Sequence, residues 1–390
     1  MERLETLRQA RSSGYTESLQ ESMERYRSDL HRIPEIDFDV YRTHAYIKRQ
    51  LETFGYDIES VAGTGIVAYK EGMDPRSFAF RADMDALQIQ EAPQEGMSEH
   101  EGFMHACGHD GHMAIVLAFA RFLSELELKR SVTLIFQPAE ETAGGARHFI
   151  EADVLERYNV EAMFGFHLYP EIEEGKIGVR KGLLMGQDGE FDIHIEGMNA
   201  HGAQPHRGND AILAAAQLIT QYQTLPGRSV AKEHAAVLNV GTLRAGDARN
   251  VIGKDAYLEG SIRTFNHSDF ETLERSMRRI DAGIEHAFDV KVTSDIRALY
   301  PPLINDADLY ESIVPVFSEF EVEPLPPLLL AEDFAYFSQH VPSFFFMLGS
   351  RNAQEGFIHP LHSSRFDFTP QALGNGLGAL IRIGEHLGLY

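Results

Sequence analysis

The chain has 390 residues, a hydrophobic fraction of 43% and a formal net charge of −24. A surface this acidic repels nucleic acids and anionic membranes, which excludes both as favoured partners. No apolar run approaches the roughly 18 residues that a membrane span requires.

The length favours two domains over one. Residues 1–20 are polar and lack the apolar segment of a secretory signal. Cys107 is the only cysteine, so no disulfide can form within the chain. These features together predict a cytoplasmic protein.

The first part of the chain alternates helical and strand-like segments. Residues 15–54 have the pattern of two helices separated at Pro34, and residues 113–126 predict a further, largely apolar helix. Short apolar runs predict strands at 65–69, 78–82, 132–136, 162–166 and 344–348. Such alternation is typical of an α/β sheet covered by helices on both faces.

The middle of the chain has a different pattern. Its strand candidates alternate apolar and polar residues, as half-exposed strands do. The predicted elements are strand, helix, strand, strand, helix and strand, at 191–196, 210–223, 237–240, 256–263, 268–288 and 290–298. This order is the ferredoxin-like split pattern. We therefore expect a mixed-sheet α/β/α domain, formed by residues 1–184 and 299–390, with a ferredoxin-like α+β domain at 185–298 inserted into it.

Four of the apolar runs lead into potential metal ligands. The acids and histidines that follow them are Asp83 and Asp85, Glu140 and Glu141, His167, and, after a loop, His362. A fifth segment, 104–112, places Cys107 and His109 at the start of the helix at 113–126. Because binding sites in open α/β sheets form at the carboxyl ends of strands, we expect these side chains to meet.

The residue types indicate a metal centre. Thiolate, imidazole and carboxylate suit zinc, and also manganese, cobalt or nickel. One catalytic ion does not need five protein ligands, whereas two ions with a bridging ligand use five naturally. The five candidates are Cys107, His109, His167, His362 and one of the adjacent acids Glu140 and Glu141. The other glutamate is then available as a general base.

The same residues also have structural interpretations. A lone cysteine often packs in a core, adjacent acids are common in solvated loops, and a histidine beside a strand can be a satisfied core residue. For His105 and His112 a structural role, or a role in supporting a metal ligand without binding the metal, is favoured over a ligand role. The aspartates Asp83 and Asp85 are compatible with simple turn residues.

The motifs together resemble those of the aminoacylase and hippurate-hydrolase branch of the two-metal metallopeptidases. Relatives in that branch include N-acetyl-diaminopimelate deacetylases and plant auxin-amino-acid conjugate hydrolases. The matching stretches are 81–87, 105–110, 137–141, 167–168, 250–252, 331–334 and His362. The resemblance extends from about residue 28 to the C-terminus.

The resemblance implies a role for each candidate in the larger domain. Cys107 would bridge two divalent metal ions per subunit. His109 and His167 would complete one ion, and Glu141 and His362 the other. The general base would be Glu140, and Asp85 would orient a ligand histidine.

The resemblance also implies that the inserted domain is a lid and dimerisation domain. His201 would reach the active site of the partner subunit in a homodimer and polarise the substrate carbonyl. Asn250 and Arg263 would hold the substrate carboxylate, and His206 would also contact substrate. The chain departs from the family pattern at residues 198–200, where a lysine and two glycines are replaced, and at Thr142 and Gly253.

The implied activity is hydrolysis of the amide bond of an N-acyl, most simply N-acetyl, amino acid. N-acetyl-diaminopimelate deacetylation is the leading specific version. A dipeptidase or carboxypeptidase of the same architecture is the alternative, and a non-catalytic binding protein with a vestigial site is a third.

Overall fold

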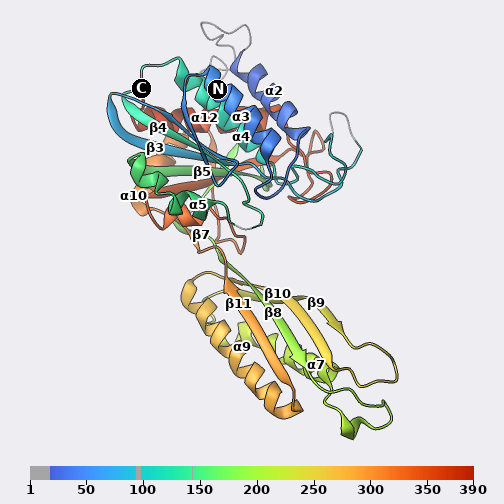
Figure 1. The fold of residues 1–390 in the computed structure, drawn as a ribbon. Helices are drawn as coiled ribbons and strands as arrows, with labels where there is room; N and C mark the ends of the chain where they lie inside the picture. Colours follow the sequence, from blue (N-terminus) through green and yellow to red (C-terminus); the bar gives the residue numbers. More distant parts are fainter. Residues whose placement is uncertain (1–17, 94–97, 143) are drawn as a thin grey trace. The chain divides into compact units, whose positions relative to one another are not determined.

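The computed structural model describes residues 18–93, 98–142 and 144–390, which divide into two compact units (Figure 1). The first unit extends to Leu184 and also includes Ile304–Pro326 and Asp333–Tyr390. The second consists of Met185–Leu303 and Pro327–Glu332. Within the described ranges, every helix is too short or too polar to span a bilayer.

The first unit is built on an eight-stranded mixed sheet in the order β1-β2-β4-β3-β5-β14-β6-β13. Its strands are β1 (Asp57–Val61), β2 (Gly65–Lys70), β3 (Asp74–Asp83), β4 (Arg130–Gln137), β5 (Val160–Glu173), β6 (Lys176–Val179), β13 (Glu321–Pro324) and β14 (Ser343–Arg351). The central strands β4, β3, β5 and β14 pair in parallel. They are buried almost throughout, as strands covered on both faces must be.

The helix α4 (His109–Ser124) lies at the core of this unit and packs against other helices and the sheet. Nearly all of its residues are buried, which explains why it is apolar around its whole circumference. The other helical elements of the unit are α2 (Leu19–His31), α3 (Tyr41–Thr53), α5 (Ala146–Glu151), α6 (Val154–Arg157), α10 (Ala307–Ile313), η2 (Val314–Phe317), α11 (Ala335–Ser338) and α12 (Pro370–His386). Ser18 and Glu21 form a capping box that starts α2.

The second unit has a four-stranded antiparallel sheet in the order β11-β8-β10-β9. Its elements are β8 (Gln187–Glu196), η1 (Pro205–Arg207), α7 (Ala211–Tyr222), α8 (Leu225–Ser229), β9 (Ala236–Ala245), β10 (Asp255–Thr264), α9 (His267–Phe288) and β11 (Lys291–Ala298). Apolar side chains of the sheet pack with those of α7 and α9 in one core. The strand order fourth, first, third, second is the ferredoxin-like arrangement that the sequence predicts. A separate two-stranded sheet consists of β7 (Gly182–Met185) and β12 (Leu303–Asn305).

Some element boundaries differ from the expectation. The strand expected to end at residue 166 continues to Glu173, so His167 lies inside β5, which keeps its pairing with β14. The helix expected from residue 113 begins at His109, directly after Gly108, whose φ of 84° turns the chain sharply into the helix. The helix expected from residue 15 is described only from Leu19, and residues 15–17 lie outside the described ranges.

Candidate metal centre

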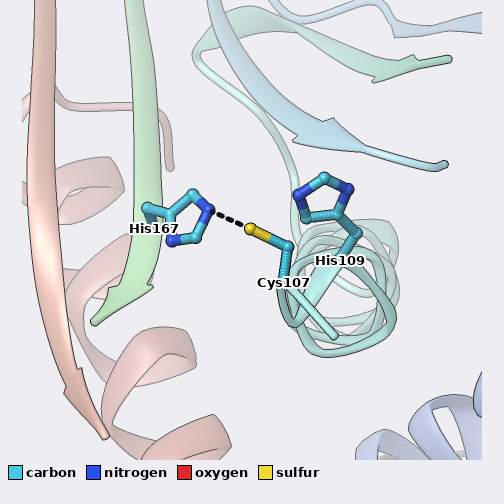
Figure 2. A group of neighbouring side chains, drawn as sticks. All are labelled: Cys107, His109 and His167. Carbon is cyan, nitrogen blue, oxygen red and sulfur yellow. Dashed lines mark hydrogen bonds between the residues drawn. The ribbon is translucent and has the colours of Figure 1, made fainter. Parts of the chain in front are cut away.

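The expected metal ligands come together in the first unit. Two groups of possible ligand atoms, each within 4.8 Å of one another, share Cys107. One group adds His109 and His167, and the other adds Glu141 and His362. Figure 2 shows the Cys107 sulfur directed toward the ring of His167, at 3.4 Å between Sγ and Nε2.

The local structure explains how residues far apart in sequence meet. Cys107 and His109 flank the sharp turn that opens α4, and His167 lies on β5 (Figure 2). Glu141 follows the end of β4, after a turn in which Ala139 has a φ of 60°. The loop of His362 is fixed by a hydrogen bond from the His362 backbone N–H to the carbonyl oxygen of Ala106, at 2.8 Å. This bond places His362 beside the cysteine loop.

One buried nitrogen in the group has no hydrogen-bond partner among the described residues. It is Nε2 of His109, whose nearest carboxylate oxygens belong to Asp83 at 3.6 Å and Glu141 at 3.8 Å. Buried polar atoms are nearly always paired, so an unpaired imidazole nitrogen here indicates a missing ligand. The donor set of sulfur, nitrogen and oxygen suits divalent transition metals or zinc. The residues therefore fit a pair of cations that share Cys107.

Both inner histidines have the ring orientation that a ligand needs. His109 donates from Nδ1 to the carbonyl oxygen of Asp85, at 2.8 Å, and His167 donates from Nδ1 to the carbonyl oxygen of Leu168, at 2.6 Å. When either ring is neutral with its proton on Nδ1, its Nε2 lone pair faces the shared space. Such outer hydrogen bonds fix the tautomer of metal-binding histidines.

The carboxylate of Asp85 lies near His109 and also binds the main chain of both glutamates. Its two oxygens accept the backbone N–H groups of Glu140 and Glu141, each at 3.0 Å. Only the main-chain carbonyl of Asp85 contacts His109 within hydrogen-bond distance, since its nearest carboxylate oxygen is 3.7 Å from Nδ1. Asp85 thereby fixes the main chain of both glutamates.

Glu140 lies beside the candidate ligands. One of its carboxylate oxygens is within 4.8 Å of ligand atoms of His109 and Glu141, and the residue is 7% exposed. A carboxylate in this position is close enough to exchange a proton with a water molecule held between the ligands.

Without a bound cation, the candidate ligands are not all in the deprotonated form that binds metal. Burial alone would lower the pKa of His109, but nearby carboxylates, Asp83 foremost, raise it to about 10. Burial lowers the pKa of His167 to about 3, so that this ring is neutral. Burial and the charge of Glu141 raise the pKa of the Cys107 thiol. Cation binding to these groups must therefore release protons.

A buried polar network behind the site includes residues to which the sequence reasoning gave no role. The guanidinium of Arg81 donates to Asp83 at 2.8 Å, to Asp333 at 2.8 Å and to the side-chain oxygen of Gln137 at 3.0 Å. Asp333 also accepts from Gln137 at 2.7 Å and from the backbone of Ala146 at 2.9 Å. The sequence signal that could have revealed this network is Arg81, a charged residue inside an otherwise apolar strand.

The residues expected to contact substrate lie in the second unit. The main chain of His201 forms a β-bridge with Val251, and the backbone N–H of Gly202, the residue after His201, donates to the carbonyl oxygen of Asn250 at 2.8 Å. The ring nitrogen Nδ1 of His201 accepts from the Ala203 N–H at 3.1 Å, which leaves Nε2 to carry a proton when the ring is neutral.

The other two candidates of this unit are not part of that pair. The Arg263 guanidinium lies 2.6 Å from a carboxylate oxygen of Asp188. His206 is exposed within η1. The structure thus brings His201 and Asn250 together and pairs Arg263 with an acid that the sequence reasoning did not identify.

Comparisons with known proteins agree with this geometry. The model of peptidase family M20/M25/M40 matches residues 79–386. An N-acetyldiaminopimelate deacetylase of Bacillus velezensis is 35% identical over 365 residues, which cover 91% of this chain and 96% of the relative. An uncharacterised hydrolase of Staphylococcus saprophyticus is 34% identical and covers 89% of this chain and 92% of the relative. A crystal structure of a dinuclear metal binding peptidase of the M20 family from Bacillus subtilis matches with a TM-score of 0.81 and 31% identity, covering 95% of this chain and 98% of that one.

Proposed function

The chain belongs to peptidase family M20/M25/M40 and is a hydrolase, and from this premise we propose that it hydrolyses N-acyl amino acids at a two-metal centre. The favoured substrates are N-acetyl amino acids, with N-acetyl-diaminopimelate first among them, because relatives 35% identical to this chain are named N-acetyldiaminopimelate deacetylase. The observation that carries the proposal is the pair of ligand groups that share Cys107, with Glu140 beside them.

Five side chains would hold the cations. Cys107 would bridge them, His109 and His167 would complete one, and Glu141 and His362 the other. Two such ions, when bound, supply a water nucleophile at neutral pH and polarise the scissile carbonyl. Divalent zinc, manganese, cobalt and nickel all suit these ligands.

Glu140 moves the proton in this scheme. It takes a proton from the attacking water as the new C–O bond forms, and delivers it to the amide nitrogen as the C–N bond breaks. The products are a carboxylate, acetate for an acetyl group, and a free amino acid. Asp85 keeps Glu140 in place through its backbone N–H.

The second unit would recognise the substrate. We place His201 at the oxyanion, because Nε2 of its neutral ring is the nitrogen free to donate. The site that it serves would be that of a partner subunit, which requires a homodimer. Asn250 and Arg263 would bind the substrate carboxylate, and His206 would contact substrate at its edge. Asp188 lies at one Arg263 nitrogen, so the other guanidinium nitrogens remain for this task. A thiol that must bind metal also fits a reducing compartment, and we place the enzyme in the cytoplasm.

The test is a substrate panel with metal-stripped protein reloaded separately with zinc, manganese, cobalt or nickel. The panel contains N-acetyl-diaminopimelate, other N-acetyl amino acids, hippurate and dipeptides. We expect acyl release from N-acetyl amino acids and much slower cleavage of dipeptides. Faster dipeptide cleavage would assign a dipeptidase instead. Two bound metals without turnover of any member of the panel would overturn the proposed activity.

A further inference from the structure

We propose that His112 is a positioning residue that holds the candidate ligand His167 in place through the main chain of Leu168. The inference rests on the proposed metal centre and assigns a role to a histidine of the Cys107 segment that is not among the five ligands. It also gives Asp83, which Arg81 holds, a contact that leads toward that centre.

The contacts of His112 determine its tautomer. The backbone N–H of Leu168 donates to Nε2 of His112 at 3.0 Å, so Nε2 carries no proton in this bond. Nδ1 of the same ring lies 2.6 Å from Asp83 Oδ1 and must be the donor to that carboxylate. Both nitrogens of His112 are therefore committed. Although Asp83, His109 and His112 are close enough to one another to hold an ion, His112 has no lone pair left for one.

The backbone of β5 needs this histidine at Leu168. The pairing of β5 with β3 ends at Phe164, so among the described residues β3 supplies no main-chain partner to β5 beyond that point. The N–H of Leu168 is buried there, and a buried backbone N–H requires an acceptor. Nε2 of His112 is that acceptor.

The main chain of Leu168 thus takes part in two hydrogen bonds. Its N–H bonds to His112, and its carbonyl oxygen accepts Nδ1–H of His167 at 2.6 Å. The second bond fixes the ring orientation by which His167 directs Nε2 toward Cys107. A shift of the Leu168 main chain would therefore move the acceptor that sets the ring of His167.

The far end of the chain of contacts is also fixed. Asp83 accepts from Arg81 at 2.8 Å through its other oxygen, and Arg81 is held in turn by Asp333. All of these side chains are buried. The network gives His112 one orientation, with a carboxylate on one side and a main-chain donor on the other.

Two substitutions separate positioning from packing. In His112→Gln the amide oxygen can occupy the place of Nε2 and accept from Leu168. In His112→Asn the shorter amide occupies the place of Nδ1, where it can contact Asp83 but does not reach Leu168. Removal of such an outer contact typically lowers metal affinity by about 10–100-fold. We expect that loss in His112→Asn, and an affinity near that of the wild type in His112→Gln.

A third variant tests the same series of contacts from the Asp83 end and keeps His112. In Asp83→Asn the amide oxygen must face Arg81, which can only donate, so the amide NH₂ faces His112 Nδ1. His112 must then accept at Nδ1 and carry its proton on Nε2, opposite the N–H of Leu168. Two donors would face each other, and we expect a loss of zinc affinity similar to that of His112→Asn.

The measurement is Zn²⁺ affinity of the full chain by competition with a chromophoric chelator, with thermal unfolding of the metal-free forms as the control for folding. Weaker zinc binding in His112→Asn than in His112→Gln supports the proposal. Equal affinity in the two His112 variants, with both folded, overturns it, and so does wild-type affinity in Asp83→Asn. A wild-type chain that binds no zinc or other divalent metal would instead overturn the proposed metal centre.

Discussion

The carboxylate of Asp85 accepts the backbone N–H of Glu140 at 3.0 Å, and its second oxygen accepts that of Glu141 at the same distance. The proposed base and a candidate metal ligand thus depend on one side chain. In Asp85→Asn only one oxygen remains, and the NH₂ group faces one of the two N–H donors. We expect kcat to fall by about 10–100-fold, as for other outer contacts of metal sites.

The matched control for Asp85→Asn is Asp57→Asn, which makes the same chemical change at an exposed position in β1. Steady-state rates of acyl release and metal content are measured for both. Wild-type kcat in Asp85→Asn would mean that the turn of the two glutamates holds its shape without the carboxylate.

Glu140→Gln should abolish turnover and leave metal content intact. The amide keeps the shape of the side chain but cannot take a proton from water. We expect kcat to fall by roughly three orders of magnitude or more. Glu141→Gln is the matched variant, and there we expect loss of bound metal. Near-normal kcat in Glu140→Gln would show that another group is the base.

Mixed dimers test the proposed role of His201. His201→Ala and Glu140→Gln should each be inactive, but co-expression of the two with different tags gives mixed dimers with one complete site. If subunits associate at random, activity should recover to about a quarter of the wild-type level. Isolated mixed dimers without activity would refute the transfer of His201 to the partner's site.

The reactivity of Cys107 should depend on metal and on pH. Burial and the charge of Glu141 raise the pKa of the thiol, so the metal-free protein should alkylate slowly at neutral pH and faster in alkaline solution. A thiolate bound between two cations should stay protected at both. Because Cys107 is the only cysteine, the mass of the alkylated chain reports this site alone. Equal rates with and without metal, in folded protein, would favour a core cysteine.

His31 should make stability depend on pH. Burial alone would lower its pKa, but hydrogen bonds to Asp110 at 2.8 Å and Glu91 at 3.1 Å raise the pKa to about 9. Because the folded pKa is above the ordinary value of about 6.5, the stabilisation is complete below that value and is lost as pH rises through about 9.

The measurement for His31 is the thermal midpoint of metal-free protein across this range. The difference between wild type and His31→Gln should be largest near pH 6 and narrow above about pH 9. His340→Gln, the same chemical change at an exposed histidine, is the control. A difference that stays constant with pH would contradict the protonated state of His31.

The main elements of both units could be predicted because their periodicity is strong. The buried strands β4 and β14 are short apolar runs, and the second half of β8, Phe191–Glu196, alternates buried apolar and more exposed polar residues. Four-residue strands such as β6 and β13 were not predicted. They are defined by pairing with strands distant in sequence, and so short a segment carries no period of its own.

The candidate ligands could be found from the sequence because each one follows a recognisable segment. The contacts that hold them could not. The N–H groups of Glu140 and Glu141 reach Asp85 only through the turn at Ala139, and the N–H of Leu168 reaches His112 only because β3 pairing stops short of it. Both depend on where strands end in space, which residue order alone does not give.

The hydrogen bond between the His362 N–H and the carbonyl oxygen of Ala106 has a consequence for biosynthesis. Four candidate ligands are translated by residue 167, but the fifth follows 195 residues later (362 − 167), after the whole second unit. At about 5–20 residues per second the ribosome needs roughly 10–40 s for that stretch. During this interval the nascent chain carries the thiol and two of the histidines but lacks both β14, which pairs with the His167 segment of β5, and His362, so the group of candidate ligands is completed last by the loop of His362.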